Sequence, residues 1–226
     1  MATVAILPVK RFEAAKQRLQ AALGSGSRQA LAAAMFADVL SALRRSSLVE
    51  MVIVVSGEPA AREAMGEPDL MLVADPADKG QSPAALTGLA RASALGYESA
   101  LLIPGDTPLL DPLEVDSLIS NASVSDLDLV IVPDRHGTGT NALLLDPSRS
   151  FQPQFGLESR VLHEQQAKRR GLRHSIEKVP SLLLDVDTPE DLDALRKAFD
   201  ERRGHAPRTQ GVLRQFKRSR QSAVTA

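Results

Sequence analysis

The sequence has no cysteine and no tryptophan, and its aromatic side chains are six phenylalanines and one tyrosine. Without cysteine, disulfide bonds, thiolate metal sites and a cysteine nucleophile are excluded. Aromatic residues make up 3% of the chain and hydrophobic residues 43%, so Leu, Val, Ile and Ala have to fill the core. No apolar stretch approaches the roughly 18 residues of a membrane span. The formal net charge of −1 predicts no general attraction to nucleic acid or acidic membranes.

A chain of 226 residues is long enough for one large α/β domain and short for two. The first residues, 1–8, contain a short apolar run without a preceding basic segment or a following cleavage site, which indicates a buried strand. Because the chain has no cysteine, we expect a cytoplasmic protein. From Glu201 onward the chain carries seven Arg or Lys side chains and one acid. We expect residues 1–200 to form the domain and residues 201–226 a basic, disordered extension, in preference to a nucleic-acid-binding arm.

Short apolar runs alternate with helix-like stretches along the chain. Most of the runs are continuous, as in strands covered on both faces, and seven are predicted to be strands: 4–7, 51–55, 70–73, 100–103, 127–132, 142–145 and 181–186. Four stretches are predicted to be helices: 28–45, 82–95, 159–170 and 189–201. This alternation predicts a mostly parallel, doubly wound sheet. Ligands of such sheets bind beyond the carboxyl ends of the strands, so polar residues directly after a strand are candidates for a site.

The segment Gly105-Asp106-Thr107-Pro108 directly follows the predicted strand 100–103. Its glycine lets the chain turn, and the next residue brings a carboxylate to the edge where ligands bind. Hard divalent cations prefer such oxygen ligands. The local sequence fits two roles of Asp106 equally well, a metal ligand or the cap of the turn that Thr107-Pro108 opens.

A second acidic segment, Asp185-Val186-Asp187, ends the last predicted strand. The following residues, Thr188 to Asp191, have the spacing of a capped helix start and need no functional explanation. Asp185 and Asp187 are two positions apart, so on a strand their carboxylates would point to the same face and repel each other. A metal ion between them explains this pattern better than a solvated strand edge.

The first predicted strand leads into a loop that carries Lys10, Lys16 and Arg18. Cations of this kind neutralise a triphosphate and hold a departing pyrophosphate, although a basic first loop is by itself weak support for such a site. The glycine-lysine-serine spacing of a phosphate-binding loop is absent.

Two further segments have no obvious structural role. Residues 136–141 are rich in glycine and hydrogen-bond donors and lead into a strand, and residues 155–159 open the helix that contains His163. Gly156 would allow backbone amides to approach a ligand and Ser159 offers a hydroxyl, so together they could hold a phosphate or carboxylate. A glycine turn with a serine cap explains each of them alone equally well. The sequence has no serine in a nucleophile elbow, and its four histidines lack zinc-ligand spacing.

Together these segments resemble the guanylyltransferases that activate a small phosphorylated acid with GTP in the biosynthesis of the deazaflavin coenzyme F420. The resemblance extends over about residues 3–198 and rests on the order and spacing of several segments. These are Leu7-Pro8-Val9-Lys10, Ala15-Lys16-Gln17-Arg18-Leu19, Pro104-Gly105-Asp106-Thr107-Pro108-Leu109, Gly137-Thr138-Gly139-Thr140-Asn141-Ala142-Leu143, Phe155-Gly156 with Ser159 and His163, and Leu184-Asp185-Val186-Asp187-Thr188-Pro189.

The resemblance implies a single-domain α/β nucleotidyltransferase fold, GT-A-like or Rossmann-like, in which a mostly parallel mixed sheet is the middle layer of a three-layer sandwich. It implies Mg²⁺ as cofactor, GTP as co-substrate, a homodimer as a possible assembly and a downstream transferase that takes the product. Asp106 and Lys16 would act in catalysis. The implied contacts are Asp106, Asp185 and Asp187 to the metal, Lys10, Lys16 and Gly80 to GTP, and Thr140, Gly156 and Ser159 to the phosphorylated acid.

One segment departs from the family pattern. Members usually have glycine-leucine-asparagine before the helix that opens near residue 84, whereas this chain has Lys79-Gly80-Gln81-Ser82-Pro83. Because this segment would border both pockets, the acid stays open among phosphoenolpyruvate, 2-phospho-L-lactate and 3-phospho-D-glycerate, with phosphoenolpyruvate favoured.

Two other functions fit the sequence less well. A molybdopterin guanylyltransferase or a cytidylyltransferase would have a Gly-x-Gly-x-x-Arg loop after the first strand, where this chain has Pro8-Val9-Lys10. A non-catalytic nucleotide-binding protein would not need carboxylates at two separate strand ends, and it would tolerate Asp106→Asn.

Overall fold

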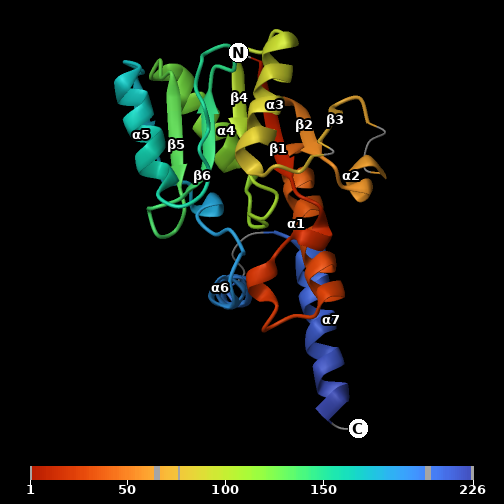
Figure 1. Ribbon diagram of the computed structural model, residues 1–226. Helices are drawn as coiled ribbons and strands as arrows, with labels where there is room; N and C mark the ends of the chain where they lie inside the picture. The colour runs from red at the N-terminus through yellow and green to blue at the C-terminus, as the bar shows by residue number, and fades with distance from the viewer. Residues whose placement is uncertain (1, 64–66, 76, 202–204, 225–226) are drawn as a thin grey trace.

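The computed structural model describes the chain except residues 1, 64–66, 76, 202–204 and 225–226. In this part a seven-stranded sheet has the order β3-β2-β1-β4-β6-β5-β7 (Figure 1). Its strands are β1 (Thr3–Val9), β2 (Val49–Ser56), β3 (Leu70–Ala74), β4 (Ser99–Leu102), β5 (Leu129–Pro133), β6 (Thr140–Leu145) and β7 (His174–Ile176). Neighbours pair in parallel except at β6, which is antiparallel to β4 and β5. The predicted α/β fold with a mostly parallel mixed sheet is confirmed.

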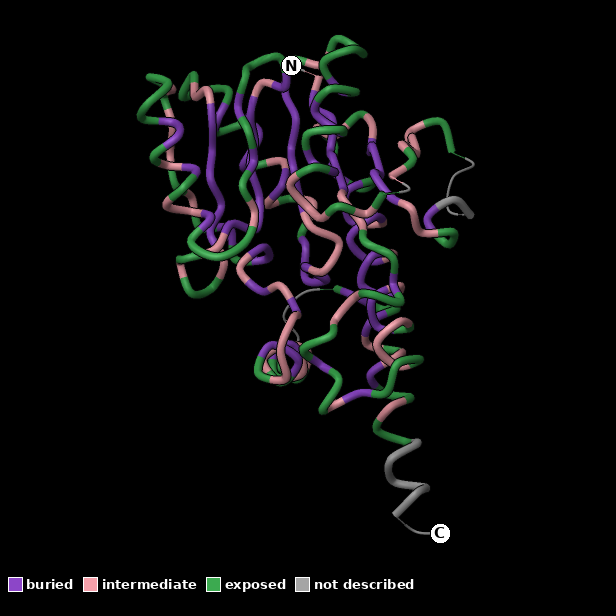
Figure 2. Tube along the Cα trace, in the orientation of Figure 1, coloured by how far each residue is buried: buried purple, intermediate pink, exposed green. Residues whose placement is uncertain are grey.

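Helices cover both faces of the sheet. They are α1 (Ser25–Leu43), α2 (Pro59–Glu63), α3 (Gln81–Ala94), α4 (Pro112–Val124), α5 (Ser159–Arg169), α6 (Pro189–Asp200) and α7 (Pro207–Val224), with short 3₁₀ helices η1 (Phe12–Ala14), η2 (Gln17–Leu19) and η3 (Pro180–Leu182). Helices α1 and α4 share one apolar core with the sheet, and α3 and α5 share the other. Alternate residues of β1 enter the two cores, and the central strands are buried (Figure 2). None of the described helices is long and apolar enough to cross a membrane.

The predicted helices form close to their expected bounds, and α4 is an additional helix. Its start is encoded locally, because Asp111 caps it by accepting a hydrogen bond from the Leu113 amide at 2.9 Å and Pro112 is its first residue.

The strand predicted at 181–186 is wrong. The segment forms η3 and an irregular stretch, and the last strand of the sheet is β7, at His174–Ile176. The apolar run that indicated a strand is nevertheless buried in part, since Leu182 belongs to the core that the sheet shares with α1 and α4, and Leu184 belongs to a third cluster. These side chains are buried without strand pairing, so the apolar run indicated burial but not a strand.

Residues 207–224 form helix α7, which corrects the expectation of a disordered extension there. Thr209 and Leu213 are four residues apart and buried on one face of the helix. Asp38 of α1 accepts hydrogen bonds from the first amides of α7, at 3.3 Å from Arg208 and 2.8 Å from Thr209. Helix α7 therefore lies against α1, and its far end projects from the body (Figure 1). The folded unit extends beyond residue 200.

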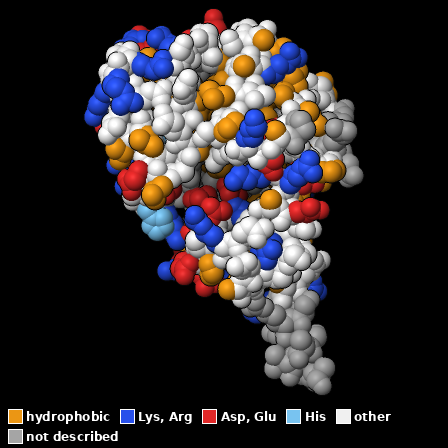
Figure 3. All heavy atoms as spheres, viewed as in Figure 1, with side chains coloured by type: hydrophobic (Ala, Val, Ile, Leu, Met, Phe, Trp, Pro, Cys, Tyr) orange, Lys and Arg blue, Asp and Glu red, His pale blue; other side chains and the backbone are white. Residues whose placement is uncertain are grey.

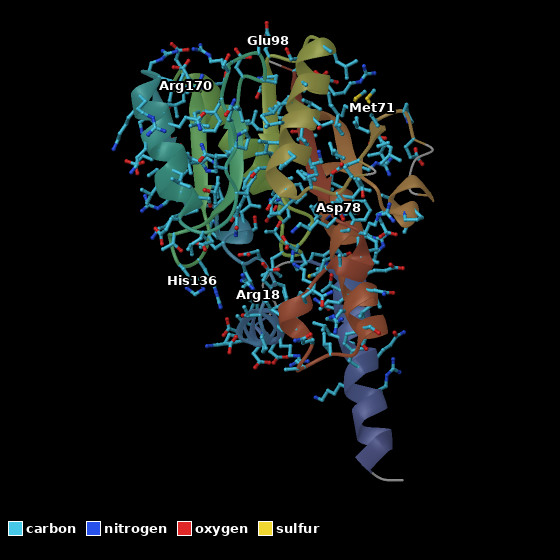
Figure 4. The ribbon with its side chains drawn as sticks, viewed as in Figure 1. Arg18, Met71, Asp78, Glu98, His136 and Arg170 are labelled. Carbon is cyan, nitrogen blue, oxygen red and sulfur yellow. The ribbon has the colours of Figure 1, made fainter. Side chains whose placement is uncertain are left out.

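The strand directions bring the candidate segments to one edge of the sheet. Strand β6 runs against β4, with Leu143 opposite Leu102, so the start of β6 lies beside the end of β4. Figure 4 places Asp78, Arg18 and His136 toward this edge, and Glu98 and Arg170 at the opposite end.

Candidate active site

A cavity of about 600 Å³ opens at this edge of the sheet. It is lined by every site residue that the sequence predicts: Lys10, Lys16, Gly80, Asp106, Thr140, Gly156, Ser159, Asp185 and Asp187. Acidic and basic side chains gather between the sheet domain and the region of α6 (Figure 3). The fold thus brings segments more than 170 positions apart into one charged cavity.

Asp106 lies just beyond β4, where the chain turns at Gly105 and Asp106. Its Oδ2 atom accepts a hydrogen bond from the ammonium group of Lys16, whereas its Oδ1 atom is buried and has no hydrogen-bond partner in the described chain. Its carbonyl oxygen accepts from the Val186 amide at 3.1 Å. This backbone bond joins the two acidic segments directly. A buried carboxylate oxygen without a donor suits a cation better than the cap of a turn.

Lys16 connects the loop after β1 to both acidic segments. Its Nζ atom donates to Asp106 and, at 2.8 Å, to Asp187 Oδ1, and its side chain is only 6% exposed. Burial opposes the charge on Lys16, but the two carboxylates outweigh burial and raise its pKa. Burial would likewise raise the pKa of Asp187, but the charge of Lys16 outweighs it and the pKa is lowered. Both groups are therefore ionised at neutral pH.

Asp185 is held by a different partner. The Asn141 side-chain amide, on β6, donates to Asp185 Oδ1 at 3.2 Å and to the Leu182 carbonyl at 2.7 Å. Burial, together with the nearby charge of Asp106, raises the pKa of Asp185 to about 6. The two carboxylates of the segment thus have separate partners, and the shared strand face assumed for them does not exist.

Asn141 is the site residue that the sequence reasoning left without a role. The predicted ligands of the cation follow apolar runs, whereas Asn141 lies at the start of a strand. Because β6 is antiparallel, its start lies at the edge where the parallel strands end. An asparagine directly before the apolar run of residues 142–145 was the available signal.

The cavity wall near α5 carries the three residues predicted to hold the phosphorylated acid. Thr140 begins β6, and its hydroxyl is 3.0 Å from Nδ1 of His163. Gly156 has a φ of +129°, a conformation that favours glycine. Ser159 is buried and is the first residue of α5, which makes Glu158 the N-cap. The serine-cap explanation of Ser159 is therefore wrong, and its hydroxyl is not used as a helix cap.

The residues predicted to contact GTP lie on two other walls. Lys10 follows β1 and is exposed to solvent at the cavity. Gly80 precedes α3 with φ 108° and ψ 177°, backbone angles open essentially to glycine alone. The first amides of α3 therefore start at the cavity wall, where a helix N-terminus favours an anion.

The carboxylates are not arranged as a ready-made metal cage. Among the described residues, no three Asp, Glu or His side chains converge as a metal site. Lys16 occupies the position between Asp106 and Asp187. Mg²⁺ commonly takes only one or two carboxylates from a protein, with phosphate oxygens of the substrate and water completing its shell. The unpartnered Oδ1 of Asp106 and the buried carboxylate of Asp185 are donors of this kind.

The mixed α/β sheet carries two acidic segments and a basic loop at one edge, which is the arrangement that the sequence resemblance predicts for a nucleotidyltransferase. The fold is similar to a solved nucleotidyl transferase from Methanothermobacter thermautotrophicus, with a TM-score of 0.65 and 18% identity, covering 88% of this chain and 98% of that one. Residues 3–206 match the family described as guanylyl transferase, CofC like. The chain belongs to this family, which confirms the resemblance seen in the sequence.

The relatives act, by name, on three different acids. A phosphoenolpyruvate guanylyltransferase of Conexibacter woesei is 48% identical, over 97% of this chain and 98% of its own. A 2-phospho-L-lactate guanylyltransferase of Methanothermobacter thermautotrophicus is 34% identical, over 85% and 83%. A 3-phospho-D-glycerate guanylyltransferase of Phenylobacterium zucineum is 34% identical, over 83% and 86%. The protein is thus a nucleotidyltransferase of the guanylyltransferase family.

Proposed function

We propose that this enzyme condenses GTP with phosphoenolpyruvate to a guanosine diphosphate-linked intermediate and pyrophosphate, for coenzyme F420 biosynthesis. The observation that carries the proposal is Lys16, a buried ammonium held by Asp106 and Asp187 in the cavity. Such a group belongs in a site that neutralises a polyphosphate. Phosphoenolpyruvate is favoured because the relative named for it is 48% identical and matches nearly the full length of both chains.

In the proposed reaction, a phosphate oxygen of the acid attacks the α-phosphorus of GTP in line. A new P–O bond forms on that phosphorus, the bond to the β-phosphate oxygen breaks, and pyrophosphate leaves with its electron pair. Both reactants are anions, so the protein has to neutralise charge and align the two groups. Lys10 and Lys16 supply positive charge at the cavity, and no covalent enzyme intermediate is needed.

The acid is expected on the wall formed by β6 and α5. The hydroxyls of Thr140 and Ser159 and the open backbone at Gly156 would hold its carboxylate and phosphate groups. GTP is expected on the walls formed by the β1 loop and the start of α3, near Lys10 and Gly80. In this proposal the acid and the triphosphate would lie on different sides of Lys16 and Asp106.

Asp106, Asp185 and Asp187 are proposed to hold Mg²⁺. When bound, the cation would screen the charge of the phosphates and orient them. The buried Oδ1 of Asp106 is the oxygen that we assign to it first, because it has no protein partner. The Asn141 side-chain amide, which donates a hydrogen bond to Asp185, would orient that carboxylate toward the cation.

A pyrophosphate-release assay tests the function by crossing GTP, ATP and CTP with the three acids, in the presence and absence of Mg²⁺. The transferase that consumes the product should be included as a trap, because the product is expected to be labile. We expect release with GTP and phosphoenolpyruvate that requires the cation. Faster release with another acid would identify that acid, and not phosphoenolpyruvate, as the substrate. No release with any acid would overturn the proposed reaction.

A further inference from the structure

His163 lies behind the cavity wall and contacts the acid side of the site only through other residues. It is fully buried in α5, between the rings of Phe151 and Phe155, whose centroids are 5.7 and 5.6 Å away. Its ring nitrogens each have one partner, Thr140 on β6 and the backbone of Gln154. Thr140 and Phe155 line the cavity, so His163 joins two parts of its wall.

The contact with Gln154 determines where the imidazole proton lies. The Gln154 amide donates to His163 Nε2 at 2.7 Å, and a backbone N–H can only donate, so Nε2 carries the lone pair. A neutral imidazole then has its proton on Nδ1. Burial lowers the pKa of His163 to about 4, which keeps the ring neutral at physiological pH. The Nδ1–H group therefore donates to the Thr140 hydroxyl oxygen, 3.0 Å away.

This direction leaves the Thr140 hydroxyl with a free proton. Its oxygen accepts from His163, and it cannot donate back to a nitrogen that already carries hydrogen. Thr140 borders the cavity, so its O–H is available to an acceptor there. Phosphate and carboxylate oxygens are acceptors only. With the opposite tautomer, Thr140 would donate to His163 and present lone pairs to an anion.

The same histidine also holds the segment that leads to Gly156. Three backbone amides of this segment donate hydrogen bonds to side chains of the helices α5 and α3. These bonds run from Gln152 to Gln166 Oε1 at 2.8 Å, from Gln154 to His163 at 2.7 Å and from Phe155 to Ser82 Oγ at 2.9 Å. The ring thus has two separable tasks, a donor to Thr140 and an acceptor for the loop.

We propose that His163 is a positioning residue that makes the Thr140 hydroxyl an obligate hydrogen-bond donor to the phosphorylated acid. The proposal rests on the proposed function of the cavity. It assigns the donor task of Nδ1 to substrate binding and the acceptor task of Nε2 to loop support.

Two substitutions separate these tasks. In His163→Asn the side-chain amide nitrogen can take the position of Nδ1 and still donate to Thr140. In His163→Gln the side-chain oxygen can take the position of Nε2 and accept from Gln154, while the donor is lost. We expect His163→Gln to raise the KM for the acid about tenfold or more, the same effect that we expect of Thr140→Val, and His163→Asn to stay within about threefold of the wild type. The KM for GTP should remain unchanged in both.

A purely structural role predicts the opposite order, with His163→Gln better than His163→Asn, and this result would overturn the proposal. In a Thr140→Val background, His163→Gln should have no further effect on the KM for the acid. Additive effects of His163→Gln and Thr140→Val on the KM for the acid would also contradict the proposal. Thr140→Ser, which keeps the hydroxyl, should restore acid binding relative to Thr140→Val.

The tautomer can be measured without any change at His163. A variant in which His136, His174 and His205 are replaced by Gln leaves one histidine, and a long-range ¹H–¹⁵N spectrum then reports its protonated nitrogen. A neutral ring with its proton on Nδ1 is expected, and a proton on Nε2 would overturn the proposal even if the His163 variants fail to fold. If the wild type releases no pyrophosphate while this tautomer is found, the failure lies with the proposed function.

Discussion

Lys16 illustrates how single residues prepare the site before any substrate binds. Its ammonium is almost completely buried, and such a charge is costly unless opposite charges surround it. Asp106 and Asp187 provide these charges. Lys16 also has left-handed backbone angles, φ 56° and ψ 36°, which cost a residue with a side chain about 1–2 kcal/mol. The fold maintains this strained residue where a triphosphate is expected.

Asp106→Asn tests the assignment of Asp106. The amide is similar in shape to the carboxylate but removes a negative charge and one cation-binding oxygen, so we expect kcat to fall about 10²–10³-fold with the fold retained. Pyrophosphate release and circular dichroism measure the two effects. Glu98→Gln is the matched control, because Glu98 is exposed at the opposite end of the molecule (Figure 4). Normal activity of Asp106→Asn, or wild-type turnover in excess chelator, would contradict the assignment.

His163 is expected to make the stability of the protein depend on pH. Its pKa falls from 6.5 to about 4 on folding, so between these values the unfolded chain binds more protons than the folded one. The contribution of His163 to the free energy of unfolding is therefore most favourable above pH 6.5. It decreases by about 3 kcal/mol in all as the pH falls toward 4. Urea unfolding of the wild type and His163→Asn at several pH values measures it. The variant should have the shallower dependence in this range, and parallel curves would contradict the buried neutral ring.

The start of α6 shows how a helix terminus positions a site residue. Thr188 and Asp191 form the capping box that the sequence predicts. Asp191 Oδ2 also accepts a hydrogen bond from the Asp187 amide at 3.1 Å, and Arg135 pairs with Asp191 Oδ1 at 2.6 Å. The cap thus fixes the backbone of Asp187, whose side chain contacts Lys16.

Thr188→Ala should lower the free energy of unfolding by about 1 kcal/mol, because it removes the side-chain acceptor of the Asp191 amide. Chemical unfolding followed by circular dichroism measures the change. Ser120→Ala serves as control, since Ser120 is exposed within α4 and alanine favours a helix interior. Equal stability of the two variants would show that the cap contributes nothing.

The two neighbouring residues at the start of β6 serve opposite walls of the cavity. Thr140 contacts His163 of α5, and Asn141 contacts Asp185 on the other side. This follows from strand geometry, in which successive side chains point to opposite faces. The family resemblance implied a role for Thr140 but none for Asn141. The reversal of β6 depends on pairing between strands about forty residues apart, which no local pattern encodes.

For the molecule as a whole, α7 completes a third apolar cluster beneath the cavity. Leu213 of α7 belongs to this cluster together with Met35 of α1. Leu184 and Val186, which flank Asp185, belong to it as well. The C-terminal helix therefore supports the acidic segment from below, although it contributes no residue to the cavity lining described here.

Deletion of all residues after Gly204 should lower the free energy of unfolding by roughly 2–5 kcal/mol, because it exposes this cluster and leaves the buried Asp38 without its amide donors. Asp38→Asn should have a smaller effect of the same sign. We also expect kcat of the truncated protein to fall, since Leu184 and Val186 lose support. Unchanged stability and kinetics would instead indicate a solvated extension.

The sequence alone determined the features that neighbouring residues encode. Apolar runs, helix periodicity and caps predicted six strands of the sheet and the helices α1, α3, α5 and α6, and ordered motifs predicted the family. Contacts distant in the chain required the folded protein. Residues 181–186 are buried without pairing to a strand and so form a short 3₁₀ helix and an irregular stretch. Helix α7 is ordered by its contact with Asp38 of α1. Such outcomes depend on which surfaces meet, because a side chain's partner and a histidine's tautomer are set by atoms that only the fold brings within hydrogen-bonding distance.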